Sequence, residues 1–383
     1  MIAPLRLHLP RRLAFGCDCT ATLAADLAHD GSKRVFFLTA RVTEPFAQEF
    51  VRQLQALGIA TEILSGVERE PTVDMFHETV THVRRFNADT VVGIGGGSVL
   101  DLAKLLAAFN TSSQTLEETF GINLLASHST RIVCIPTTAG TGSEASPNAI
   151  LLDEKTALKK AVISPHLLPN ATYVDPKLML GVPPKVTAAT GIDAMTHCLE
   201  AFTNRFAHPM IDLYALEGVR LAAAYITRAV ANGQDIEARE HMALASLYGG
   251  ICLGPVNTAA VHALAYPLGG EFHIPHGQSI ALMLPHVFRF NVVATPARHA
   301  QIAVALGVAP QSDDLATALA GAAKLEELID ACGLPPRLRD YGVEESSIPV
   351  LVESAMTVTR LLKNNPREVT ATDALEIYRQ ANV

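Results

Sequence analysis

The stretch VVGIGGGSVLDLAK, residues 91–104, decides the fold class of the first half of the chain. A β-branched apolar run enters a glycine-rich loop, and apolar residues at helical spacing follow from Val99 onward. Glycines allow backbone N–H groups to approach an anion closely, and the start of a helix adds partial positive charge. The stretch therefore predicts a strand, a loop able to cradle phosphate and a helix. Read as GxGxxG from Gly93 it ends on Ser98, so it is not the Rossmann fingerprint, and a tight turn without a ligand is the alternative.

Alternating strand and helix patterns surround this stretch. Strand-like runs lie at residues 34–39, 60–64, 90–93 and 131–135, and helical spacing of apolar residues lies at 44–57, 73–87 and 99–109. This alternation predicts a parallel sheet with helices on its faces. Beyond residue 180 the strand-like runs stop and helical patterns rich in Ala and Leu continue. We predict an α/β N-terminal domain with dinucleotide-binding loops over residues 1–180 and an all-α C-terminal domain over residues 181–383.

The composition excludes several classes of function. The 383 residues are 49% hydrophobic and 18% charged, which is typical of globular proteins and not of disordered ones. The net charge is −8 and no long basic run is present, so neither nucleic acid nor a membrane surface is expected as a partner. Six scattered cysteines without a CxxC pair indicate a reduced, cytoplasmic setting. A small molecule is the expected partner.

A second loop, PTTAGTGSEAS at residues 136–146, follows the apolar run RIVCI. Hydroxyl groups and glycine amides at the carboxyl end of a strand suit phosphate or ribose. Lys159 and Lys160 downstream offer a cation to the same ligand. The alternatives are a polar surface turn and a pair of solvated lysines.

Four residues of the second half form a candidate metal site. Asp193 and His197 are four positions apart in a helical pattern, so they share one face, where they can grip an ion or form a local hydrogen bond. His262 lies in an apolar helical run, where a lone histidine is more often a core residue. His276 follows Pro275 at a place where a new helix should begin.

The chain must reverse between the last two histidines if they share an ion. Fourteen residues of straight helix would separate them by about 21 Å. Breaks are expected at Pro267, Gly269, Gly270 and Pro275. One carboxylate and three imidazoles are compatible with Fe(II) or Zn(II) and unsuited to Ca(II) or Mg(II).

Together the motifs resemble the iron-containing (group III) alcohol dehydrogenase family, whose fold is related to those of glycerol dehydrogenase and dehydroquinate synthase. The resemblance covers nearly the whole chain. Its motifs are GVEREPT (66–72), GGGSVLDLAK (95–104), PTTAGTGSE (136–144), YVDP (173–176), GIDAMTHCLEAF (191–202), HALAYPLGGEFHIPHG (262–277) and LMLPHV (282–287).

The resemblance implies the residues of the site. The implied metal ligands are Asp193, His197, His262 and His276. The implied cofactor-binding residues are Gly95, Gly96, Gly97, Ser98, Asp101, Thr137, Thr138, Thr141 and Lys160. It also implies a homodimer.

Two departures from the family pattern bear on chemistry. Many NAD-using relatives have an aspartate after the strand at 34–39, where this chain has Ala40 followed by Arg41, so NADP stays open and Arg41 is available for its extra phosphate. Tyr266 stands where some relatives have a histidine near the nicotinamide, and a phenol is a poor base at neutral pH. Tyr266 and His273 are the candidate proton relays, with packing as the other role of Tyr266.

We therefore expect a metal-dependent dehydrogenase that transfers a hydride between NAD(P) and a small alcohol, aldehyde or ketone. A reductase of a 2-oxo or unsaturated acid, resembling maleylacetate reductases, would need a cationic anchor such as Arg205. A lyase resembling dehydroquinate synthase and a nucleotide-binding protein without turnover are the more distant alternatives.

Overall fold

The computed structural model describes residues 2–156 and 158–383, which form two compact units. The sheet unit contains His8–Thr138 and Gly142–Leu180. The helical unit contains Gly181–Val383, the short segment Ala139–Thr141 and the described residues before His8. The predicted domain boundary after residue 180 stays a prediction, and two short segments of the first half group with the helical unit.

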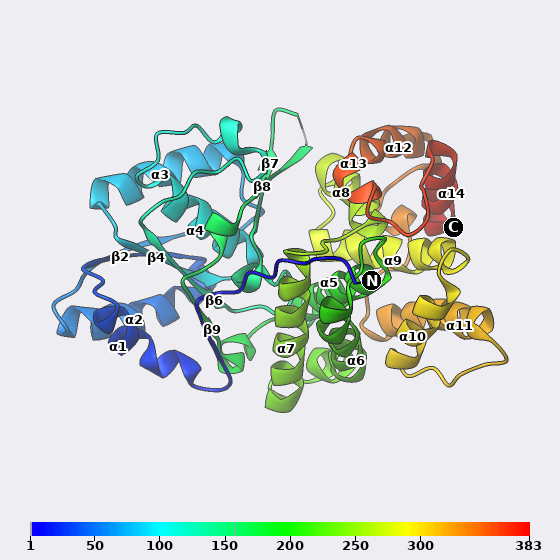
Figure 1. The fold of residues 1–383 in the computed structure, drawn as a ribbon, viewed down its shortest axis with the longest axis horizontal. Coiled ribbons are helices and arrows are strands. Elements are labelled where there is room, and N and C mark those ends of the chain that lie inside the picture. The colour runs from blue at the N-terminus through cyan, green and yellow to red at the C-terminus, as the bar shows by residue number, and fades with distance from the viewer. Residues whose placement is uncertain (1, 157) are drawn as a thin grey trace. The chain divides into compact units, whose positions relative to one another are not determined.

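The sheet unit is built on six parallel strands in the order β1-β9-β6-β4-β2-β3 (Figure 1). The strands are β1 (Arg12–Phe15), β2 (Arg34–Thr39), β3 (Ala60–Ser65), β4 (Thr90–Gly95), β6 (Arg131–Pro136) and β9 (Ala171–Val174). The helices between them are α1 (Leu23–His29), α2 (Glu44–Ala56), α3 (Val73–Phe86) and α4 (Gly97–Phe109). The predicted parallel α/β architecture is confirmed.

Successive residues of each strand pack on opposite faces of this sheet, because side chains alternate along a strand. Val35 and Phe37 of β2 pack in one core cluster with residues of α1 and α2. Phe36 and Leu38 pack in another with residues of α3 and α4. Both faces are thus covered, and the carboxyl ends of the strands are left to carry loops.

Five of the strands that the structure describes were not predicted from the sequence. They are β1, β9, and the small sheet β5-β8-β7, made of β5 (Gly121–Ile122), β7 (Asn148–Asp153) and β8 (Leu158–Ile163). β7 and β8 form an antiparallel pair that contains the two lysines of TALKKAV. The apolar pattern of β8 is interrupted by these lysines, and Lys159 is nevertheless buried beside Glu70 at 2.5 Å.

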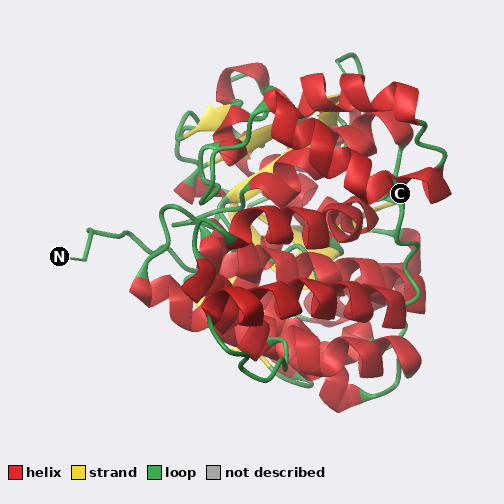
Figure 2. Ribbon diagram, turned by 90° about the vertical axis from the view of Figure 1, so that its right-hand side faces the viewer, coloured by secondary structure: helices red, strands yellow, loops and turns green. Residues whose placement is uncertain are grey.

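Every regular element that the structure describes beyond residue 183 is a helix. Figure 2 shows how many helices, drawn red, face the viewer from this side. The α-helices are α5 (Pro184–Thr203), α6 (Pro209–Ala231), α7 (Ile236–Leu253), α8 (Ala260–Phe272), α9 (His276–Val292), α10 (Pro296–Ala305), α11 (Asp314–Ala331), α12 (Ile348–Met356), α13 (Thr359–Leu362) and α14 (Ala371–Asn382), and Leu338–Tyr341 and Glu345–Ser347 are short 3-10 helices. Among the described helices, none combines the length and apolar character needed to cross a membrane. The predicted all-α character of the second half is confirmed.

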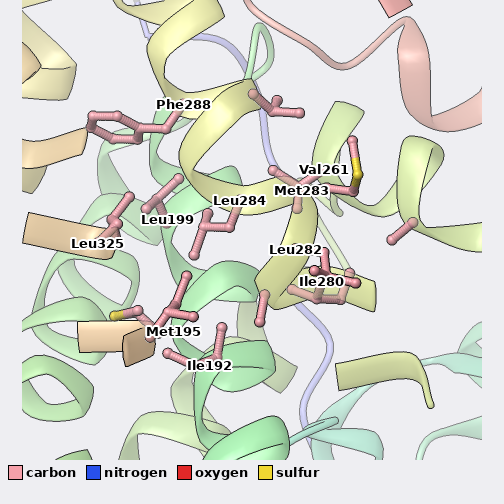
Figure 3. Close-up of a cluster of buried hydrophobic side chains, with 14 of the residues drawn as sticks. Ile192, Met195, Leu199, Val261, Ile280, Leu282, Met283, Leu284, Phe288 and Leu325 are labelled. Atoms are coloured by element: carbon pink, nitrogen blue, oxygen red, sulfur yellow. The ribbon is translucent and has the colours of Figure 1, made fainter. Parts of the chain in front are cut away.

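The core of the helical unit packs α5 against α9. Figure 3 shows Ile192, Met195 and Leu199 of α5 together with residues of α8, α9 and α11. Burying such side chains contributes roughly 1.5–3 kcal/mol each. The polar residues Asp193 and His197 are interleaved with this apolar stripe, so core packing determines where they point.

The predicted chain reversal is present, but three of its four predicted breaks are wrong. Helix α8 continues through Pro267, Gly269 and Gly270, and it ends only at Phe272. His273 then adopts a left-handed conformation with φ 55°, and α9 begins directly after Pro275. Tertiary packing of this buried helix outweighs the unfavourable intrinsic propensities of Pro and Gly. As predicted, His276 is the first residue of a new helix.

Candidate metal centre and cofactor loops

Helix α5 presents Asp193 and His197 from the same face, one turn apart. Both side chains are buried, and Asp193 Oδ1 lies 3.6 Å from His197 Nε2. This separation is too long for a hydrogen bond, so the local hydrogen bond that the sequence left open is not formed. The Asp193 carboxylate and the His197 imidazole are therefore adjacent but form no hydrogen bond with each other.

His262 of α8 and His276 of α9 approach the same carboxylate oxygen. His262 Nε2 lies 3.4 Å and His276 Nε2 lies 3.6 Å from Asp193 Oδ1. The ring of His197 stacks on that of His262 with centroids 4.7 Å apart. Three separate helices therefore bring one carboxylate and three imidazoles to a common point.

A divalent cation fits this arrangement. Asp193, His262 and His276 each offer one ligand atom, and these atoms lie within 4.8 Å of one another. His197 is outside that mutual set but adjoins it through Asp193. Asp193 Oδ1 and His262 Nε2 are buried and have no hydrogen-bond partner among the residues that the structure describes, a state that costs several kcal/mol unless an ion satisfies them.

The protonation of the cluster follows from burial and mutual charge. Burial alone would raise the pKa of Asp193, but the neighbouring imidazoles outweigh it and lower the pKa below the usual value. Burial lowers the pKa of His197, which favours the neutral imidazole that a metal requires. Burial opposes the charge of His262, yet Glu200 and Asp193 raise its pKa to about 9.

Glu200 is the site residue that the sequence interpretation missed. Its Oε2 lies 2.5 Å from His262 Nδ1, and its Oε1 accepts a hydrogen bond from the Val261 N–H at 2.7 Å. A carboxylate that holds Nδ1–H turns Nε2 toward Asp193 and toward any bound cation. The available signal was spacing, because Glu200 is seven residues after Asp193 and therefore lies on the same face of α5.

Gly277 permits the close approach of α9 to α5. A Cβ atom at this position would lie 2.3 Å from the carbonyl oxygen of Ala189. No side chain fits there without moving one of the helices. Because His276 is adjacent in sequence, its distance from Asp193 depends on the absence of that Cβ atom.

The two candidate proton relays occupy different surroundings. Tyr266 is half-buried on α8, with its ring centroid 6.0 Å from that of His276. His273 is exposed, at the carboxyl end of α8. The relay role of either residue stays a prediction.

The first glycine loop joins β4 to α4 as predicted. Gly95 ends β4, Gly96 precedes the helix, and Gly97 and Ser98 form its first turn. A Cβ atom on Gly95 would lie 2.5 Å from Val99 Cγ2, so the strand end packs directly on the helix. Backbone N–H groups at the start of α4 are therefore available to an anion.

The second loop follows β6, the strand adjacent to β4. Thr137 and Thr138 stay with the sheet unit, whereas Thr141 belongs to the segment that groups with the helical unit. Gly140 in that segment donates its N–H to Ser246 Oγ at 2.8 Å. Lys160 lies on β8. Cofactor contacts by these residues stay predictions.

Asp101 and Lys104 of α4 anchor the second loop. Asp101 accepts hydrogen bonds from Ser143 Oγ at 2.5 Å and from the Ile150 N–H at 2.9 Å. The fully buried Lys104 ammonium donates to the carbonyl of Ser143 at 2.9 Å and to two further carbonyls of the chain that follows. Asp101 was predicted to bind cofactor, and its carboxylate here joins α4 to the loop.

Comparisons with known proteins agree with this geometry. A family profile described as iron-containing alcohol dehydrogenase matches residues 10–176, and the profile for the C-terminal part of the Fe-containing alcohol dehydrogenase family matches residues 187–382. The 1,3-propanediol dehydrogenase of Citrobacter freundii is 36% identical over 361 residues, 92% of each chain.

Solved structures show the same fold. A 1,3-propanediol oxidoreductase superposes with a TM-score of 0.95 at 33% identity, covering 99% of this chain and 100% of that one. Sulfoacetaldehyde reductase from Bifidobacterium kashiwanohense, solved in complex with NAD+, superposes with a TM-score of 0.88 at 26% identity, covering 99% of both chains.

The parallel α/β sheet unit and the helical unit with its Asp/His cluster thus define a metal-dependent oxidoreductase of alcohols and their carbonyl counterparts. The chain belongs to the iron-containing alcohol dehydrogenase family. The family identified from the sequence motifs is confirmed.

Proposed function

We propose that this protein interconverts a small alcohol and its aldehyde or ketone, with NAD(H) as hydride carrier and Fe(II) as its metal. The observation that carries the proposal is the convergence of three histidine Nε2 atoms to within 3.6 Å of the buried Asp193 Oδ1. Such a mixed oxygen and nitrogen donor set suits Fe(II), and it also accepts Zn(II).

Asp193, His197, His262 and His276 would hold the ion. When bound, the metal polarises the substrate oxygen, and the nicotinamide exchanges the hydride. Glu200 keeps the ring of His262 in a fixed orientation before any ion arrives, because its carboxylate engages both Nδ1 and the backbone at Val261. This rigidity reduces the reorganisation that metal binding requires.

The glycine loop at the start of α4 would hold the pyrophosphate of the cofactor. Its donors are backbone N–H groups, whose positions are set by the packing of Gly95 on Val99. Ser98, Thr137 and Thr138 would add hydroxyl groups at the ends of the neighbouring strands β4 and β6. Lys104 and Asp101 would position the second loop, and the predicted cofactor contact of Asp101 stays a prediction.

Tyr266 would relay a proton between the substrate oxygen and solvent. Its half-buried ring has its centroid 6.0 Å from that of His276, whereas His273 is exposed. A phenol O–H can donate a proton to the substrate oxygen when a carbonyl compound is reduced.

Reduction of a 2-oxo or unsaturated acid has less support. That reaction needs a cation to hold the substrate carboxylate, and Arg205, the candidate from the sequence, is exposed. Maleylacetate reductases usually lack the complete set of metal ligands, whereas this chain has all four candidate ligands. A homodimer, and a cytoplasmic location, stay predictions.

The test is anaerobic purification, metal analysis, and an assay of alcohols with NAD+ and of aldehydes and ketones with NADH. We expect bound iron and net production or consumption of NADH with small substrates. Net turnover of NADH would exclude a lyase that uses NAD only transiently. Iron-loaded protein that binds NADH but converts no alcohol or carbonyl compound would contradict the proposal.

A further inference from the structure

The carboxyl end of β2 lies beside the glycine loop. β2 pairs with β4 so that Thr39 is opposite Ile94, the residue before Gly95. Thr39 Oγ1 and Thr43 Oγ1 lie 2.9 Å and 3.2 Å from the Ile94 carbonyl oxygen. In dinucleotide-binding α/β folds, an acid near this place hydrogen-bonds the adenosine ribose of NAD, whereas an Arg accommodates the 2′-phosphate of NADP.

The chain supplies a carboxylate at this place from a different strand. β2 is followed by Ala40, which has no polar side chain, and by the exposed Arg41. Glu68 comes from the loop after β3, and its Oε1 accepts a hydrogen bond from the Arg41 backbone N–H at 2.8 Å. The negative charge therefore lies at the end of β2, although the two residues directly after β2 are not acidic.

The loop that carries Glu68 is built against β2. The N–H groups of Gly66 and Val67 both point to the Thr39 carbonyl oxygen, at 3.0 Å and 3.4 Å. Gly66 has φ 119°, a conformation that favours glycine, and Val67 is buried. The position of Glu68 is thus set by backbone contacts on both sides of the strand end.

We propose that Glu68 selects NAD(H) over NADP(H), an inference that rests on the proposed function. With one oxygen bound to the Arg41 N–H, the other is placed to accept a hydrogen bond from a ribose hydroxyl. A 2′-phosphate would instead bring close to two negative charges against the same carboxylate. Arg41 contributes its backbone N–H to this arrangement.

The experiment measures dissociation constants of NADH and NADPH by fluorescence titration, and kcat/KM with each in the reduction of one aldehyde. We expect the parent protein to prefer NADH by at least about tenfold. Glu68→Gln should bind NADPH about tenfold or more tightly than the parent does, and NADH more weakly. Arg41→Ala should keep the preference for NADH. Glu49 is an exposed acid on α2, so Glu49→Gln is the matched control for the change in net charge.

The outcomes separate this inference from the proposed function. The parent protein could bind and turn over either dinucleotide while Glu68→Gln keeps the same cofactor preference as the parent. That result would overturn the role of Glu68 and leave the proposed function intact. A parent protein that prefers NADPH, with the preference abolished in Arg41→Ala, would also overturn it. Protein that binds neither dinucleotide would contradict the proposed function, and the inference would fall with it.

Discussion

The sheet unit and the helical unit prepare their candidate sites in different ways. In the sheet unit the donors are backbone N–H groups and short hydroxyls at strand ends, and one local stretch, residues 91–104, carries most of them. In the helical unit the donors are side chains of α5, α8 and α9, separated by up to 83 positions (276 − 193). A site made of backbone is encoded locally, whereas a site made of side chains depends on helix packing.

The largest expected effect is on the helical unit alone. His262→Ala removes a ligand atom and leaves Glu200 with a buried charge, so metal content after dialysis should fall to background and turnover by more than about 100-fold. Elemental analysis and a steady-state assay measure both. NADH binding should stay unchanged, since the glycine loops lie in the other unit.

His241→Ala is the matched control, because His241 stacks on Tyr225 away from the cluster. It should keep its metal. Full metal content and activity in His262→Ala would show that the convergence on Asp193 has no role.

Glu200→Gln should have the next largest effect. The amide loses the charge that orients His262 Nδ1, and loss of such a partner typically lowers metal affinity about 10–100-fold. Titration of the metal-free protein with Zn(II) against a competing chelator measures the affinity. Glu217→Gln, which breaks only a surface pair with Arg220, should leave it unchanged, and equal affinities for all three proteins would contradict the positioning role.

Gly95→Ala tests the sheet unit in the same way. The added methyl group would lie 2.5 Å from Val99 Cγ2, so the strand-to-helix turn must open at a cost of about 1–3 kcal/mol. KM for NADH should rise about tenfold while metal content stays at the parent level. If metal content falls together with cofactor affinity, the two sites are not independent.

The smallest effect concerns pH. Burial raises the pKa of Glu144 to about 7, above its usual value. The protonated side chain is therefore favoured in the folded protein, and the stability that this provides is fully present at low pH and is lost as pH rises through about 7. Glu144→Gln stays neutral and should therefore unfold at a temperature a few degrees above the parent at pH 8. At pH 4 the two should unfold together, and a difference that is equal at both pH values would contradict this assignment.

Prediction from the sequence was accurate where the signal was local. The helices around residues 44–57, 73–87 and 99–109 are present because their apolar residues recur at helical spacing and find a sheet to cover. It was wrong at Pro267, Gly269 and Gly270, because a buried helix gains more from packing than those residues cost in propensity. Glu200 was missed because its spacing from Asp193 places it only on the same face of α5, whereas its contact with His262 requires α8 to lie beside α5.

Local sequence alone determined the alternation of β2, β3, β4 and β6 with α2, α3 and α4, the two loops at strand ends, and the family. The spacing of apolar residues and the positions of glycines can be recognised without coordinates, because they involve only residues close together in the chain. Only the tertiary structure decided that Asp193 Oδ1 faces three histidines, that Glu200 holds one of them, and that Glu68 reaches the end of a strand it does not follow. These placements arise from contacts between residues far apart in sequence, and such contacts exist only after the core has packed.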